Sequence, residues 1–196
     1  ISFISVAVAV IYGVTSAYFG GWVDTIMMRF WEVIVSMPLI QVLIVVAAIW
    51  KPSIWSMIIT MSAFYWRGSV KTIRSMALQI KEETYIEAAH ALDASNLRII
   101  FKHIIPQLIP YSFASMALMV PLAIVAEATL SLLGLGDSTV VTWGQILQDA
   151  NNGGAVLKGL WWWIVPPGLF IALMGMTFAF IGFAMDTILN PKLKTR

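Results

Sequence analysis

Cysteine is absent from this chain, and charge is scarce. Without cysteine, disulfide bonds and thiolate metal sites are excluded. Only 11% of the 196 residues are charged and 60% are hydrophobic, whereas soluble domains carry roughly 25% charged residues. The mean hydropathy of +0.86 points the same way. These values indicate a single integral membrane domain, and the net charge of +2 gives no sign of nucleic-acid binding.

Catalytic and nucleotide-binding patterns are missing as well. No Gly-rich loop ending in Gly-Lys-Ser/Thr is present, so an ATP-driven process would need ATP and Mg bound on another chain. His90 and His103 have no third ligand arranged around them, and we expect neither a metal nor a cofactor on this chain. We therefore predict that it is not an enzyme. The apolar opening at Ile1, without a basic region or cleavage site, is typical of a fragment lacking its N-terminal part.

Long stretches without charge occur five times in the sequence. A helix needs about 20 apolar residues to cross a membrane, and a charge at mid-span costs about 3 kcal/mol. The sequence therefore predicts an all-α integral membrane fold. Its expected spans are approximately 1–20, 31–50, 53–70, 106–132 and 160–186. We expect a turn at Lys51-Pro52-Ser53, and a short surface helix near 141–150 within a polar loop over 134–159.

The basic residues are placed unevenly between the two sides of this topology. Of the 12 lysines and arginines, all but Lys51 and Lys158 fall on the side that holds the 71–105 loop with its flanks, the 21–32 connection and the C-terminal tail. Basic residues accumulate on the cytoplasmic side of membrane proteins. We therefore expect a multi-pass protein of the cell (inner) membrane, surrounded by lipid. Its 71–105 loop and C-terminus are cytoplasmic, and its 134–159 loop is external.

The charged 71–105 loop contains a predicted helix–turn–helix. Good helix formers fill residues 84–92, and one face of this helix collects small and larger contact residues: Tyr85, Ala88, Ala89 and Leu92. The run Asp93-Ala-Ser-Asn96 ends the helix, and Ser95 or Asn96 can cap a second helix toward Pro106. Small side chains let a partner approach the backbone. An ordinary solvated linker is equally compatible with this spacing.

The same stretch carries a resemblance to a known family. Glu87-Ala-Ala, three residues, Asp93, nine residues and His103-Ile-Ile-Pro106 resemble the EAA signature of ABC importer permeases. More narrowly, the sequence resembles the C-type permease subunit of the dipeptide, oligopeptide and nickel importers. The additional matches run through nearly the whole chain: Tyr18-Phe-Gly-Gly-Trp-Val-Asp24, the 127–136 stretch, the 143–147 stretch and Trp162-Trp-Ile-Val-Pro-Pro-Gly168.

This resemblance implies a type I ABC importer transmembrane domain whose cytoplasmic loop holds a coupling helix. In the family, that helix docks on a cytoplasmic ATPase. The implied contact residues are Tyr85, Glu87, Ala88, Ala89, Leu92 and Asp93. The implied partners are a second homologous permease subunit, two cytoplasmic ABC ATPases and an external solute-binding protein. The implied cargo is di- or oligopeptides, with nickel chelates and oligosaccharides left open. Asp93 stands where the family has glycine, at a cost of about 1 kcal/mol.

Three further residues are candidates for the translocation path or a gate. Glu127 lies near the outer end of the fourth span, where a carboxylate that bonds to neighbouring backbone is the favoured interpretation over a gate. Gln41 is interpreted first as a bond between helices and second as a path residue. Pro121 predicts a kink in the fourth span, and a hinge at this position is a second interpretation that rests on analogy. The alternative function is a secondary transporter or channel-like protein independent of ATPases, which usually shows inverted repeats and mid-span ionisable residues.

Overall fold

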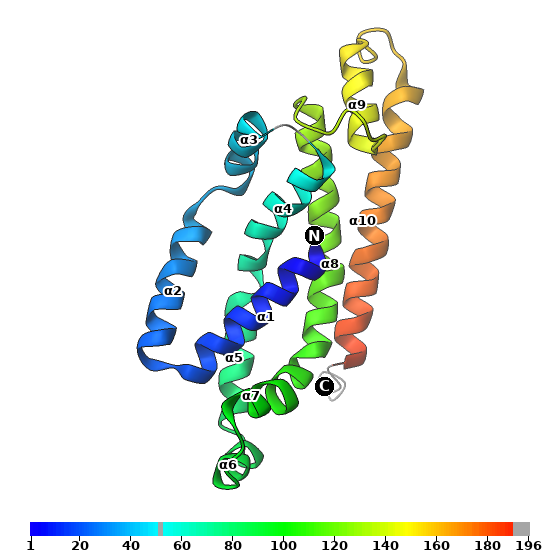
Figure 1. The fold of residues 1–196 in the computed structure, drawn as a ribbon. Helices are drawn as coiled ribbons and strands as arrows, with labels where there is room; N and C mark the ends of the chain where they lie inside the picture. Colours follow the sequence, from blue (N-terminus) through cyan, green and yellow to red (C-terminus); the bar gives the residue numbers. More distant parts are fainter. Residues whose placement is uncertain (51–52, 190–196) are drawn as a thin grey trace.

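The structure, a computed structural model, describes residues 1–50 and 53–189 and contains helices and no strands over those ranges (Figure 1). This agrees with the predicted all-α class. The turn expected at Lys51–Pro52 and the C-terminal tail lie outside the described residues. The elements are α1 (Ser2–Phe19), α2 (Gly21–Ser36), α3 (Leu39–Ile49), α4 (Ile54–Tyr65), η1 (Trp66–Gly68), α5 (Val70–Lys81), α6 (Thr84–Ala91), α7 (Asn96–Ile99), η2 (Ile100–Ile104), α8 (Ile105–Leu132), α9 (Trp143–Asn152) and α10 (Trp161–Leu189).

The stretch 31–50, which is predicted to form one span, is helical but interrupted near Pro38. A helix already begins at Gly21, where a connection was expected, and α2 and α3 meet at a 78° bend. Met37 at the break is extended, with φ −75° and ψ 125°, because a residue before proline is pushed out of the helical region by the ring of Pro38. The sharp turn from α1 into α2 uses Gly20 and Gly21, with φ of 61° and 51°, a conformation that glycine adopts without steric cost.

The third predicted span continues well beyond its expected end. After α4, the short 3-10 turn η1 leads directly into α5, so the chain stays helical to Lys81. The 71–105 loop therefore does not begin at residue 71, and its first part is a helix packed on α1. Gly13 permits this packing, because a Cβ there would lie 2.9 Å from the Ile73 side chain.

A single continuous helical segment of 37 residues, Asn96–Leu132, forms the central element of the bundle. It starts as α7, widens to a π-turn in η2 and continues as α8. Pro106 explains the widening, because its ring has no N–H and clashes with the carbonyl four residues earlier. The long α10 lies along α8 (Figure 1), and Gly182 gives room to the Leu118 side chain.

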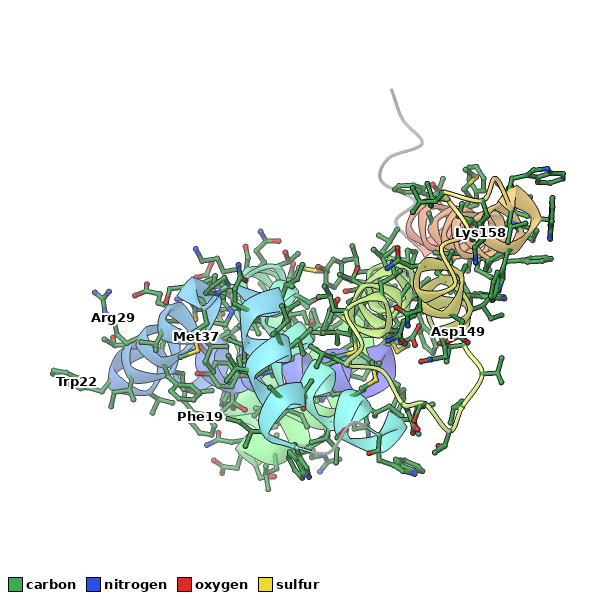
Figure 2. All side chains as sticks on the ribbon, turned by 90° about the horizontal axis from the view of Figure 1, so that it is seen from above. Phe19, Trp22, Arg29, Met37, Asp149 and Lys158 are labelled. Carbon is green, nitrogen blue, oxygen red and sulfur yellow. The ribbon has the colours of Figure 1, made fainter. Side chains whose placement is uncertain are left out.

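By length and composition, three helices of the described residues can cross a membrane, and four can if the bent α2–α3 pair counts as one span. The predicted 53–70 span is not among them, since α4 alone has 12 residues. The short helix expected near 141–150 is present as α9. Figure 1 shows α6 and α9 at opposite ends of the molecule. Seen from above, Trp22 and Arg29 of α2 lie at one edge, and Asp149 and Lys158 beside α10 lie at the other (Figure 2).

Candidate functional site: the α6–α7 elbow and an apolar pocket

The elbow, defined here as residues 84–99 (α6, α7 and their connection), projects from the end of the bundle (Figure 1). Its first helix, Thr84–Ala91, was predicted from composition and is confirmed. Ile86 is 1% exposed and belongs to the same core cluster as residues of α1, α5 and α8. Glu87 lies in the first turn, where a carboxylate favours the positive end of the helix dipole. The elbow is therefore anchored in the bundle core by two fully buried side chains, Ile86 and Ile99.

The C-terminal end of α6 closes with a Schellman motif. The Asp93 amide donates to the His90 carbonyl at 3.0 Å, and the Ala94 amide donates to the Ala89 carbonyl at 3.1 Å. This motif requires a left-handed residue after the helix, and Asp93 has a φ of 54°. The expectation that Asp93 takes the glycine conformation is confirmed. Ser95 then caps α7 by accepting a bond from the Arg98 amide, as one of the two predicted caps.

A groove of about 600 Å³ runs between α6 and the segment after it. It brings together most of the predicted contact residues, along with side chains of the turn, α7 and η2: Tyr85, Ala88, Ala89, Leu92, Asp93, Ala94, Ser95, Arg98 and His103. Leu92 is 82% exposed. Glu87 is exposed but does not line this groove. The groove thus offers a partner mainly apolar side chains together with the Arg98 guanidinium.

Tyr85 is held from within the chain. Its hydroxyl accepts a hydrogen bond from the Gln107 side chain of α8, and its ring lies 6.3 Å from that of His103. Gln107 also donates to the His103 carbonyl at 3.1 Å. Tyr85 therefore presents a fixed wall of the groove and needs no rearrangement before a partner binds.

A second set of contacts, which was not predicted from the sequence, ties this end of the bundle to α1 and α2. Arg74 of α5 pairs with Asp24 of α2, with Nε 2.6 Å from Oδ1. Ser16 of α1 donates to the same carboxylate. The Tyr18 hydroxyl donates to Asn96 Oδ1 at 2.8 Å. These partners lie far apart in the chain, so no local pattern signals them.

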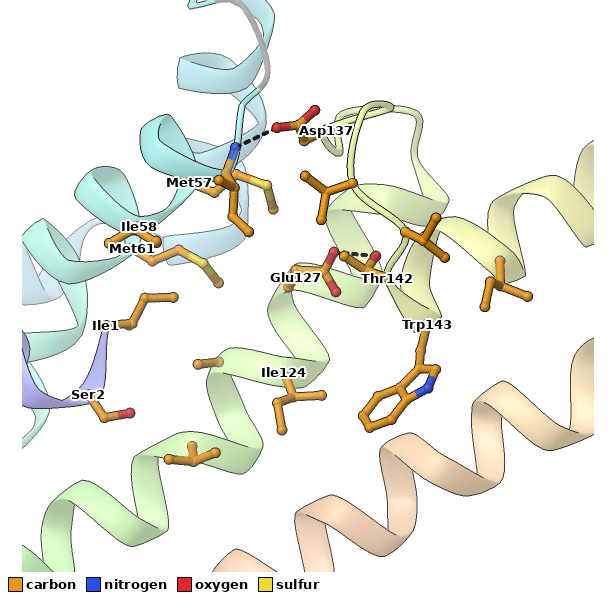
Figure 3. Close-up of a pocket in the computed structure, with 16 residues that line it drawn as sticks. Ile1, Ser2, Met57, Ile58, Met61, Ile124, Glu127, Asp137, Thr142 and Trp143 are labelled. Carbon is orange, nitrogen blue, oxygen red and sulfur yellow. Dashed lines mark hydrogen bonds between the residues drawn. The ribbon is translucent and has the colours of Figure 1, made fainter.

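An apolar pocket of about 500 Å³ lies toward the α9 end (Figure 3). Its walls come from the start of α1 with Ile1 before it, from α4 and α8, and from α9 with the loop before it, including Met61, Ile124 and Trp143. Glu127 and Asp137 are its acidic lining residues. The Ser131 and Thr142 hydroxyls each donate to Glu127 Oε1 at 2.8 Å.

Glu127 thus bonds to side-chain hydroxyls, where bonds to neighbouring backbone were expected. The carboxylate joins α8 to the N-cap of α9, since Thr142 also accepts from the Gln145 amide. Gly144 allows α9 to pack close to α8, because a Cβ there would lie 2.6 Å from the Ala128 Cα. Under either interpretation of Glu127, as a gate or as a structural link, its carboxylate lies at the pocket wall.

Asp137 secures the opposite rim of the pocket. Its carboxylate accepts from the Thr139 hydroxyl at 2.6 Å and from the Thr139 amide at 2.9 Å. It also accepts from the Ile54 amide at 2.9 Å (Figure 3). These bonds, those from Thr139 first, lower the pKa of the Asp137 carboxyl from its ordinary value. The loop after α8 is thereby fastened to the first residue of α4.

The other two path candidates lie apart from this pocket. Gln41 is exposed in the first turn of α3, and its side chain makes no hydrogen bond within the described part of the chain, so the expected bond between helices is not seen. Pro121 lies inside α8, where a Cβ on Gly175 of α10 would be 3.8 Å from it. Their roles in a path stay predictions. Over the described residues, no three His, Asp or Glu side chains gather as metal ligands.

Comparison with known proteins adds a family and several relatives. The family model described as "binding-protein-dependent transport system inner membrane component" matches residues 8–195. The chain is 35% identical over 188 residues to a dipeptide transport system permease protein of Bacillus subtilis, which covers 95% of the chain and 58% of that relative. It is 34% identical over 192 residues to an oligopeptide transport system permease protein of Haemophilus influenzae, covering 97% and 61%.

A glutathione transport system permease protein of Pectobacterium atrosepticum is 29% identical over 184 residues, covering 93% of the chain and 60% of the relative. The chain therefore spans about three fifths of the length of these curated relatives. The matched region contains both the elbow and the pocket wall.

Proposed function

The chain belongs to the family of binding-protein-dependent transport system inner membrane components, and on that premise we propose that it is a transmembrane subunit of an ATP-driven importer. It forms half of a translocation path whose other half comes from a second, homologous permease subunit. Two cytoplasmic ATPases bind and hydrolyse ATP with Mg, and an external solute-binding protein delivers cargo. The cargo is a di- or oligopeptide, which the names of the dipeptide, oligopeptide and glutathione relatives support.

The observation that carries this proposal is the elbow. Its α6 helix presents an exposed, small-residue groove, while Ile86 roots the same helix in the bundle core. Side chains that only fill space between helices are buried, whereas Leu92 is 82% exposed. A rooted helix with an open groove transmits force, because a push on the groove is passed to the packed core. We propose that the ATPase docks here and that its closure switches the bundle between inward- and outward-facing states.

Orientation follows from the same proposal. The elbow and the C-terminus face the cytoplasm, where the ATPases are, and the α9 end faces outside. Figure 1 supports this by placing α6 and α9 at opposite ends. The excess of lysine and arginine on the elbow side supports it independently.

The test compares two exposed alanines of α6, of which one lines the groove and the other does not. Ala88 lines the groove, whereas Ala91 is exposed and does not line it. Arginine is a good helix former, so Ala88→Arg and Ala91→Arg change the same side chain by the same amount without breaking α6. The variants are made in the full-length permease and purified with its partner subunits.

We expect Ala88→Arg to reduce the ATPase that co-purifies by roughly tenfold or more, because burying an unpaired cation at the centre of an interface removes a large part of the binding energy. Ala91→Arg retains the ATPase. Equal retention by both variants contradicts docking at this groove. A wild-type protein that transports cargo with no ATPase present would instead favour the ATPase-independent alternative.

A further inference from the structure

We propose that Tyr18 is a positioning residue that makes α1 and the elbow move as one body. This inference rests on the proposed function, because it concerns how motion at the docking groove reaches the bundle. Tyr18 is the penultimate residue of α1 and is only 6% exposed. Its contacts reach three successive segments of the chain: the end of α5, α6 and α7.

The three contacts use different parts of the same residue. The hydroxyl donates to Asn96 Oδ1 of α7 at 2.8 Å. The ring stacks on His90 of α6, with centroids 6.2 Å apart and planes at 20°. The backbone carbonyl accepts from Lys81 Nζ, the last residue of α5, at 2.7 Å, and the same Nζ lies 5.8 Å from the ring centroid. No other residue of α1 has a hydrogen bond or ring contact to the elbow among those seen in the described structure.

The end of α1 makes these contacts possible. The last carbonyls of a helix have no partner within it, and the turn at Gly20 and Gly21 ends α1 directly after Phe19. The Tyr18 carbonyl is therefore free to take the Lys81 ammonium, a cation that also favours the negative end of the α1 dipole. A longer α1 would use this carbonyl internally.

The rest of α1 is already locked to the bundle. Gly13 packs directly on Ile73 of α5, and Ser16 shares the carboxylate that pairs with Arg74. The elbow reaches the bundle through the buried side chains of Ile86 and Ile99, through the Tyr85–Gln107 bond and through the helix that continues from α7 into α8. Tyr18 links the end of α1 both to α5 and to the elbow, so that α1 rotates together with α6.

The decisive variant is Tyr18→Phe, which keeps the ring and the backbone carbonyl and removes only the bond to Asn96. The matched control is Tyr12→Phe. Tyr12 lies on the same helix and donates its hydroxyl to the Met27 carbonyl of α2 at 2.5 Å, so the control loses one comparable hydrogen bond without touching the elbow. Asn96→Ala removes the same bond from the other side, and Asn96→Asp keeps an oxygen acceptor.

The readout is a distance between spin labels, which requires no knowledge of the cargo. Because the chain has no cysteine, Ile11→Cys on α1 and Leu97→Cys on α7 place two labels at exposed sites, 61% and 67% exposed. The full-length permease is assembled with its partner permease and ATPases, after any cysteines in the rest of the permease and in the other subunits are replaced. Distances are recorded without nucleotide and after trapping with ATP and vanadate.

With Tyr18 intact, we expect one narrow distance that is the same in both nucleotide states. Tyr18→Phe and Asn96→Ala should add a second population that grows on trapping, with a population ratio changed about fivefold, the effect of one neutral hydrogen bond on a two-state equilibrium. Tyr12→Phe should keep the single distance, and Asn96→Asp should restore what Asn96→Ala loses. The double variant Tyr18→Phe/Asn96→Ala should match the worse single variant.

Two failures are distinguishable. If Ala88→Arg retains the ATPases, the docking function itself is wrong. If Ala88→Arg releases them but Tyr18→Phe gives the wild-type distances in both nucleotide states, only the role of Tyr18 is overturned. A second population that appears equally in Tyr12→Phe also overturns it, since the effect then follows from general loosening of α1.

Discussion

Replacing Asp93 by glycine should stabilise the Schellman motif at the C-terminal end of α6. Asp93 is the one non-glycine residue with positive φ in the described structure, at 54°. A left-handed backbone costs an L-residue about 1–2 kcal/mol, and aspartate lies at the lower end because its short polar side chain tolerates the state. Glycine avoids this cost but loses about 0.5–1 kcal/mol of chain entropy on folding.

The carboxylate adds a second contribution. Asp93 follows the C-terminus of α6, where a negative charge opposes the helix dipole by about 0.3–1 kcal/mol. Combining these contributions, Asp93→Gly should stabilise the motif by about 0.5–1.5 kcal/mol. The intermediate variant Asp93→Asn keeps a side chain suited to the left-handed state and removes only the charge. It should recover most of the gain, because the charge contributes more than the net backbone difference.

Hydrogen exchange of the Ala94 amide measures this directly, because that amide donates to the Ala89 carbonyl across the motif. Local opening controls its exchange, so a gain of about 1 kcal/mol slows exchange about fivefold. The expected order of rates is Asp93, then Asn, then Gly, from fastest to slowest. Exchange in Asp93→Gly as fast as in the wild type would refute the reasoning, since it would show that neither backbone strain nor charge opposes the motif.

Two further predictions concern the root of the elbow and the pocket rim. Ile86→Ala should destabilise the elbow by about 2–5 kcal/mol, since it empties a fully buried site, and it should speed amide exchange throughout α6. Leu92→Ala, at an 82% exposed position, should change the exchange little. Equal effects of the two variants would contradict the role of burial. For Asp137, whose pKa is lowered by bonds from Thr139 and Ile54, the ionised carboxylate should stabilise the fold fully above about pH 4, the unfolded value, and progressively less as the pH falls through the lowered pKa. The unfolding-temperature difference between wild type and Asp137→Asn should therefore close in acid, and a difference that persists once the carboxyl is protonated would be inconsistent with this account.

Local signals along the chain predicted the elbow well. The start of α6, the break after Leu92 and the cap at Ser95 depend on residues within a few positions of one another, and the structure confirms each of them. The left-handed state of Asp93 was also predictable, because the Schellman closure needs it at that position. The apolar stretches predicted the membrane class for the same reason, since lipid exposure is a property of each segment by itself.

Boundaries and long-range partners were decided by the tertiary structure. Pro38 marks locally where the stretch 31–50 can break, but the local sequence could not reveal the 78° angle at which α2 and α3 meet. Nor could it pair Tyr18 with Asn96, which lie 78 positions apart, or Glu127 with Thr142 across the junction with α9. Helix propensity and capping act over a single turn, whereas these contacts exist only after packing brings separate helices together. The sequence by itself thus determined the all-helical class and where the elbow turns; packing decided the helix boundaries and which side chains hold the elbow to the bundle.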